Sequence, residues 1–163
     1  MKHFINLQDI PAKDLRKILI DAKKRKTLRK SLNNLDVDPG SPLKGNLLIQ
    51  MFEKSSLRTR LSFYLAIKQL GGSTLTLRPD ELHLAKGGES IADTAKILSN
   101  FGNAFMLRTD NEIKLNEFKK YLSIPIINGL SPSSQPTQIL SDIFTVEEIK
   151  KKKNIEIKHY LDW

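Results

Sequence analysis

The chain has 163 residues, of which 39% are hydrophobic and 28% charged, a size and composition typical of one soluble domain with a buried core. No run of about 18 apolar residues is present, so we expect no membrane span. The absence of cysteine excludes disulfides and thiol catalysis within this chain. The opening MKHFINLQDI lacks the apolar segment of a secretion signal, so we expect a cytoplasmic location.

The formal net charge of +9 suits an anionic partner. Two lysine-rich clusters, at residues 23–26 and 150–153, contribute to this charge. Neither cluster is interleaved with aromatic residues and no nucleic-acid motif is present, so we interpret both as solvated helix ends and expect no nucleic-acid partner. An anionic metabolite remains the better candidate.

Hydrophobic periodicity predicts helices that alternate with strands. In chain order these are a helix over Pro11–Lys30, a strand over Asn46–Phe52, a helix that ends at Gly71-Gly72, a strand over Ser73–Leu77, a helix from the Ser90 cap to about Phe101, a strand over Ala104–Leu107 that leads into Arg108, a helix over Asn111–Leu122, a strand over Ile124–Asn128 and a helix over Pro136–Lys151. Residues 33–44 and 78–88 carry proline or glycine and are predicted as connections. This alternation predicts an α/β fold, a three-layer domain with a parallel sheet of about four strands and helices on both faces.

Apolar positions at helical spacing predict which faces of three helices are buried. They are Leu15, Ile18, Leu19 and Ala22 in the first helix, Leu57, Leu61, Tyr64 and Leu65 in the second, and Ile139, Leu140, Ile143 and Phe144 in the last.

The segment Phe52–Arg60 (FEKSSLRTR) lies where a predicted strand leads into a helix. A helix N-terminus offers unpaired N–H groups and the positive end of the dipole, which suit phosphate. Hydroxyl groups add donors, and a guanidinium adds a bidentate charged fork. The same residues also suit an ordinary capped helix with solvated arginines, because Ser and Thr are favoured caps.

Ligands of parallel α/β sheets bind at the carboxyl ends of the strands. Three segments reach that edge, namely Ser55–Arg60, Arg108-Thr109 and Asn128–Gln138. Arg108 ends an apolar strand, where it either lies in water or donates to a carbonyl or phosphate oxygen. We therefore predict that the three segments form one anion-binding site.

The segment Phe52–Arg60 resembles the carbamoyl-phosphate signature F-x-x-S-T-R-T-R of the aspartate/ornithine transcarbamylases, and its Glu-Lys pair is similar to the ornithine branch. Met106–Thr109 (MLRT) is similar to the family's M-I-R-T, and Asn128–Asp142 resembles N-G-L…H-P-x-Q-I-L-A-D. Asp80–Ser90 resembles the family loop that reaches into a neighbouring subunit. The chain is thereby identified as a member of this family, of ornithine carbamoyltransferase type, that matches its N-terminal carbamoyl-phosphate-binding domain only.

The resemblance implies a set of carbamoyl-phosphate contacts. These are Ser56, Leu57, Arg58, Thr59, Arg108, Gln135, Gln138 and, from the neighbouring subunit's loop, His83, with Arg108, Gln135 and Gln138 as the catalytic residues that face the carbamoyl group. It implies a homotrimer, in which Lys86 can accompany His83, and no metal or organic cofactor. Glu89 and Asp93 match family positions that we interpret as structural.

Two of these positions depart from the family pattern. Leu57 stands where the family usually has threonine, so one hydroxyl donor is missing. Gln135 replaces a histidine, and an amide can donate a hydrogen bond but cannot carry positive charge. Both departures weaken the expectation of full activity.

We assign residues 1–150 to the carbamoyl-phosphate-binding domain and 151–163 to a basic tail, where the family's second, amino-acid-binding domain would begin and which we expect to be absent. The implied reaction is carbamoyl transfer from carbamoyl phosphate to the side-chain amine of ornithine, which gives citrulline and phosphate in arginine biosynthesis or a urea-cycle-type step. One alternative is a degenerate or truncated half that binds phosphate or assembles without catalysis. Another is a transcarbamylase for a different amine, such as aspartate, putrescine or an acylated ornithine.

Overall fold

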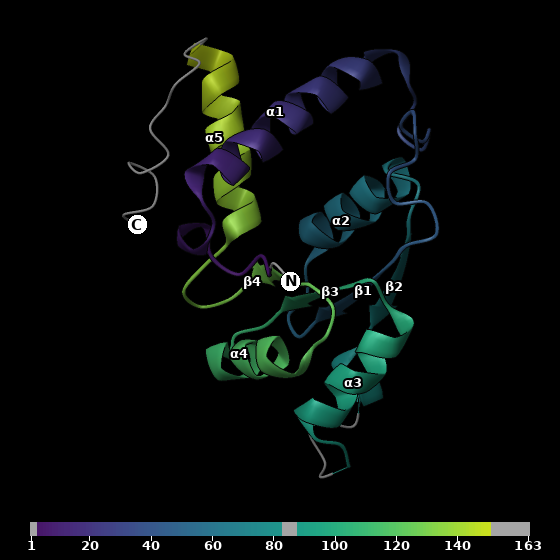
Figure 1. The fold of residues 1–163 in the computed structure, drawn as a ribbon, viewed down its shortest axis with the longest axis vertical. Helices are drawn as coiled ribbons and strands as arrows, with labels where there is room; N and C mark the ends of the chain where they lie inside the picture. Colours follow the sequence, from purple (N-terminus) through teal and green to yellow (C-terminus); the bar gives the residue numbers. More distant parts are fainter. Residues whose placement is uncertain (1–2, 83–87, 151–163) are drawn as a thin grey trace.

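A parallel sheet of four strands forms the centre of the computed structural model, which describes residues 3–82 and 88–150 (Figure 1). The strands are β1 (Leu47–Phe52), β2 (Ser73–Leu77), β3 (Ala104–Arg108) and β4 (Ile126–Leu130). Their order in the sheet is β2-β1-β3-β4, and every neighbouring pair is parallel. The predicted α/β fold with a parallel sheet is therefore confirmed.

Helices cover both faces of this sheet (Figure 1). On one face lie α1 (Ala12–Leu28), α2 (Leu57–Gln69) and α5 (Pro136–Lys150), and on the other lie α3 (Ile91–Phe101) and α4 (Glu112–Tyr121). Short 3-10 turns occur at Leu7–Asp9, Arg29–Ser31 and Pro79–Leu82. Within the described ranges, the helices are too short or too polar to cross a bilayer.

The inner strands are apolar because helices cover them on both sides. Ile49 and Met51 of β1 pack with Phe118 of α4 on one face, whereas Leu48 and Phe52 lie in a cluster that includes the α2 side chains on the other. Side chains alternate between the two faces along a strand, so one short apolar run serves both.

The first helix, α1, packs against the last, α5. Leu15 and Leu19 of α1 pack with Leu140 and Ile143 of α5 in a separate buried cluster. Ion pairs from Arg16 to Glu147 and from Lys26 to Glu148 extend the contact. This packing fixes α5, whose N-terminal end supplies residues to the site described below.

The predicted buried face of α2 is wrong. Leu57, Leu61 and Tyr64 are 74%, 50% and 44% exposed, whereas Phe63 and Ile67 pack against the sheet. Apolar residues occur on two sides of this helix. The orientation that the β1–α2 connection gives to the helix decides which side packs against the sheet. In α1 the prediction holds for Leu15 and Leu19, but Ile18 is 43% exposed.

The last strand begins two residues later than predicted, at Ile126 in place of Ile124. Pro125 has no N–H to give to the sheet, and only its carbonyl takes part, as the acceptor for the N–H of Phe105 (2.9 Å). The inward residues predicted for α5 are confirmed, since Leu140 and Ile143 are buried and Ile139 and Phe144 pack against them.

Candidate functional site

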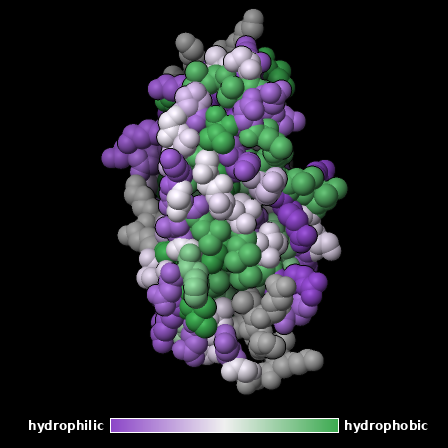
Figure 2. Space-filling model, turned by 90° about the vertical axis from the view of Figure 1, so that its right-hand side faces the viewer, coloured by the Kyte–Doolittle hydropathy of each residue, from purple (hydrophilic) through white to green (hydrophobic). Residues whose placement is uncertain are grey.

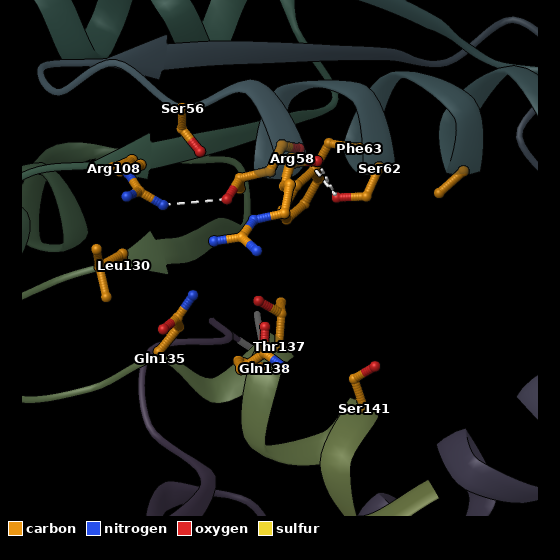
Figure 3. Close-up of a pocket in the computed structure, with 12 residues that line it drawn as sticks. Ser56, Arg58, Ser62, Phe63, Arg108, Leu130, Gln135, Thr137, Gln138 and Ser141 are labelled. Atoms are coloured by element: carbon orange, nitrogen blue, oxygen red, sulfur yellow. Dashed lines mark hydrogen bonds between the residues drawn. The ribbon is translucent and has the colours of Figure 1, made fainter. Parts of the chain in front are cut away.

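A cleft of about 950 Å³ opens at the carboxyl edge of the sheet, between the N-terminal part of α2 and the start of α5 (Figure 3). Its lining comprises Ser56, Arg58, Thr59, Ser62, Phe63 and Ala66 from the β1–α2 region, Arg108 from β3, Leu130 from β4, and Gln135, Thr137, Gln138 and Ser141 from the β4–α5 region. The three segments that the sequence placed at this edge therefore meet around one space.

Most of the residues implied by the resemblance line this cleft. They are Ser56, Arg58, Thr59, Arg108, Gln135 and Gln138. Leu57 is not among the lining residues, and its side chain is 74% exposed at the first position of α2. His83 and Lys86 lie outside the described residues.

The start of α2 differs from the starts of α3 and α4. Ser90 caps α3 by accepting from the N–H of Asp93 (3.1 Å), and Asn111 caps α4 by accepting from the N–H of Lys114 (3.0 Å). Ser56 occupies the same position before α2, with extended backbone, but its side chain makes no capping hydrogen bond. The first turn of α2 also lacks an acidic residue, whereas those of α3 and α4 each have one. The positive end of α2 is thus left for an external anion.

Two guanidinium groups approach the cleft from different elements. Arg58 extends from α2 toward Gln135, and Arg108 enters the cleft from β3 (Figure 3). Nη1 of Arg108 donates to Oγ1 of Thr59 at 3.0 Å. Nε of Arg108 is buried and has no partner within residues 3–82 and 88–150. A buried donor without a partner is costly, and an anion in the cleft would supply acceptors near this group.

Two glutamines face these arginines from the other side of the cleft (Figure 3). Gln135 precedes α5 and is half-buried, and its carbonyl accepts from the N–H groups of Gln138 (3.1 Å) and Ile139 (3.2 Å). The side chain of Gln138 donates through Nε2 to Oδ1 of Asp142 at 2.8 Å. This bond uses one amide hydrogen and leaves the other donor and the carbonyl oxygen for a ligand.

Asn128 organises the connection that carries Gln135, a role that sequence reasoning did not assign. It is fully buried in the middle of β4. Its Nδ2 donates to the Ile5 carbonyl (3.2 Å) and to Oγ of Ser131 (3.0 Å), and its Oδ1 accepts from the N–H of Leu130 (3.0 Å). The available signal was an amide side chain at the end of the predicted strand, followed by a run of small and turn-forming residues.

Two charged residues that follow β1 and β3 are paired with each other. Nζ of Lys54 lies 3.1 Å from Oδ2 of Asp110, and both side chains are more than half exposed. The hydrogen bond from Lys54 lowers the pKa of Asp110 below its ordinary value. Exposed pairs of this kind contribute little to stability. Within the described ranges, His, Asp and Glu side chains form no cluster of three or more that could hold a metal ion.

Fold and site together define an α/β domain with a cationic, hydrogen-bond-donating cleft at the carboxyl edge of its sheet. Residues 2–148 match the family described as "Aspartate/ornithine carbamoyltransferase, carbamoyl-P binding domain". The ornithine carbamoyltransferase of Brucella ovis is 43% identical over 148 residues, which are 91% of this chain and 46% of that protein.

Solved structures agree with this match. The ornithine carbamoyltransferase of Pyrococcus furiosus aligns with a TM-score of 0.85 and 38% identity, over 93% of this chain and 46% of that one. The catalytic subunit of M. jannaschii aspartate transcarbamoylase aligns with a TM-score of 0.79 and 32% identity, over 93% and 48%. The chain therefore belongs to the aspartate/ornithine carbamoyltransferase family, through its carbamoyl-phosphate-binding domain. It spans about half the length of the curated relatives it matches.

Proposed function

We propose that the cleft binds carbamoyl phosphate and that this chain supplies the carbamoyl-phosphate half of an ornithine carbamoyltransferase. The observation that carries the proposal is the uncapped start of α2, which faces two arginines and two glutamines in one cleft. Neither Arg58 nor Arg108 is paired with a carboxylate in the part of the chain that the structure describes.

The chemistry divides between the two sides of the cleft. The N–H groups at the start of α2, together with Ser56, Arg58 and Thr59, would hold the phosphate group. Arg108, Gln135 and Gln138 would donate to the carbamoyl oxygen, where negative charge develops when the amine attacks the carbonyl carbon. A carbon–nitrogen bond forms, the carbon–oxygen bond to phosphate breaks, and phosphate leaves with the electron pair and takes up the proton that the attacking amine loses. These groups act by positioning and charge stabilisation, with no covalent intermediate.

Ornithine is the acceptor we favour, because Glu53-Lys54 has the pattern of the ornithine branch and the curated relative reported above is an ornithine carbamoyltransferase. The reaction would then yield citrulline in arginine biosynthesis, in the cytoplasm. Aspartate transcarbamoylase shares the same half-domain fold, so the fold itself does not select the amine. A non-catalytic phosphate-binding half is a second candidate, favoured by Gln135, which cannot carry the charge of the family histidine.

Calorimetric titration with carbamoyl phosphate tests the binding proposal. Arg58→Ala removes a guanidinium that extends into the cleft and should weaken binding about tenfold or more. Arg60→Ala is the matched control, because Arg60 lies over the ring of Phe52 (5.1 Å to the centroid) and does not line the cleft. Equal affinities of the native chain and Arg58→Ala would refute the assignment.

We further propose that copies of the chain assemble as a trimer through the side of the molecule that carries α2 and the edge strand β2. Figure 2 shows a hydrophobic area bordered by hydrophilic side chains on this side. Leu61 and Tyr64 of α2 and Leu75 of β2 are 50%, 44% and 47% exposed. An exposed sheet edge with apolar neighbours favours coverage by another chain.

Sedimentation at low and high salt tests this assembly. Subunits that each carry a net charge of +9 repel one another more at low ionic strength, so we expect the trimer to form more readily as salt rises. Leu61→Lys should shift the equilibrium to monomer. A monomer at both salts and at high protein concentration would overturn the proposal.

A further inference from the structure

Glu53 lies directly after β1, at the start of the connection that leads to Ser56 and α2. Its side chain is only 14% exposed and is not among those that line the cleft. One carboxylate oxygen accepts a hydrogen bond from Oγ1 of Thr109, and the other accepts from Nζ of Lys114 on α4. A carboxylate is thus held behind the cleft by groups from two other elements.

Thr109 joins this carboxylate to the remaining cleft segments. It follows Arg108 directly and is 3% exposed. Its N–H donates to the carbonyl of Leu130 (3.0 Å), which lines the cleft, and its Oγ1 accepts from the N–H of Asn111 (3.0 Å). The N–H of Glu53 in turn donates to the carbonyl of Arg108 (3.0 Å). The ends of β1, β3 and β4 are therefore connected through one buried hydroxyl and one carboxylate.

Lys114 also balances charge. A carboxylate beside an anion site opposes anion binding, and the opposition is strong where water is partly excluded. The Lys114 side chain is 26% exposed and contacts the carboxylate directly. Removing one partner of such a buried pair leaves the other charge uncompensated.

We infer that Glu53, Thr109 and Lys114 are positioning residues of the cleft. Thr109 and Glu53 set the spacing between the start of α2 and Arg108, and Lys114 neutralises the Glu53 carboxylate so that it does not repel the bound anion. The inference rests on the proposed function, because it concerns the affinity of the same cleft for phosphate groups.

The positioning role is tested with Thr109→Val, which removes the hydroxyl and leaves the formal charge unchanged. Inorganic phosphate and carbamoyl phosphate are titrated by calorimetry, well below the unfolding temperature of each variant. We expect about tenfold weaker binding for Thr109→Val and native affinity for Thr109→Ser, which retains the hydroxyl. A purely structural role would lower the unfolding temperature of Thr109→Val and leave the affinity of the folded protein unchanged, which would overturn the positioning role.

The charge role is tested with Lys114→Met and its control Lys120→Met, which removes an equal charge from an exposed position of the same helix. We expect about tenfold weaker phosphate binding for Lys114→Met and less than about a twofold change for the control. The double variant Glu53→Gln/Lys114→Met should recover most of the lost affinity, because it removes the uncompensated carboxylate. A double variant as weak as Lys114→Met would overturn the charge role.

The outcomes separate this inference from the function on which it rests. A native chain that binds neither inorganic phosphate nor carbamoyl phosphate would refute the proposed function, and the inference with it. A native chain that binds both ligands, with Thr109→Val and Lys114→Met as tight as Lys120→Met, would leave the proposed function standing and overturn the inference alone.

Discussion

Gln50 provides a test of how this domain is stabilised. It lies in β1, between Thr76 of β2 and Met106 of β3, and it is fully buried. Strand alternation places its side chain on the same face as Leu48 and Phe52, in apolar surroundings. Neither its Oε1 nor its Nε2 has a hydrogen-bond partner in the described ranges. A buried amide of this kind opposes folding.

Replacing Gln50 with methionine keeps the length of the side chain and removes both polar groups. A buried polar group without a partner costs about 1–3 kcal/mol. We therefore expect Gln50→Met to raise the free energy of unfolding by about 1–3 kcal/mol. For a domain of this size that gain corresponds to an increase of roughly 3–10 °C in the unfolding temperature.

Urea unfolding followed by circular dichroism measures the change. Gln50→Glu is the opposite control, since it buries a carboxylate and should destabilise the protein. Gln138→Met is the surface control and should alter the free energy of unfolding by no more than about 0.5 kcal/mol. A lower free energy of unfolding for Gln50→Met would refute the reasoning, because it would mean that the amide is satisfied, for instance by a buried water.

Three further predictions concern the site and the pH dependence of stability. Gln135→His should strengthen carbamoyl-phosphate binding in calorimetry by about 1–3 kcal/mol near pH 6, where a histidine can be charged. Leu57→Thr should have a smaller effect, because the Leu57 side chain is 74% exposed and lies outside the cleft. Equal gains in affinity for the two variants would contradict the geometry of the cleft. Burial and then the charge of Lys119 lower the pKa of His3, whose Nδ1 accepts from the N–H of Ile126 (3.3 Å). The native state therefore binds a proton at His3 less readily than the unfolded chain does, so the contribution of neutral His3 to stability is present above the ordinary pKa of 6.5 and is lost as pH falls through the lowered pKa of the native state. Urea unfolding of His3→Gln should show a weaker loss of stability over that pH range. An unchanged pH profile of stability in His3→Gln would count against this role of His3. Ser56→Asp should stabilise the protein by about 0.5–1 kcal/mol through the helix dipole and abolish phosphate binding, and retention of binding in calorimetry would argue against a phosphate at this helix start.

The sheet could be predicted from the sequence because its inner strands are uninterrupted apolar runs, and alternation with helices leaves few other arrangements. The face that α2 buries could not be predicted in the same way. Leu57, Leu61 and Tyr64 have helical spacing, and so do Phe63 and Ile67. Periodicity shows that a helix has an apolar side, but when it has two, only the packing decides which one meets the sheet.

The location of the cleft could also be predicted, because the carboxyl ends of parallel strands must meet at one edge. The buried contacts that support the cleft could not be predicted. Glu53 contacts Thr109 and Lys114, which are 56 and 61 residues away along the chain. No local pattern links such positions, and each residue alone is typical of an exposed strand end or helix surface. Only the register of β1 beside β3 brings them together.

Ser56 and Ser90 show how the same residue at the same position of a helix can serve different purposes. Both precede a helix with extended backbone, and a sequence reading would assign a cap to each. Ser90 makes that cap, which typically contributes about 1 kcal/mol. Ser56 leaves it unmade, and the Nε of Arg108 is also buried without a partner among the residues that the structure describes. The start of α2, which faces the cleft, therefore lacks the stability that a cap or an acidic first turn could supply. A bound phosphate would provide acceptors for both groups, so the domain should gain stability from its ligand at a helix start that has neither a side-chain cap nor an acidic first turn.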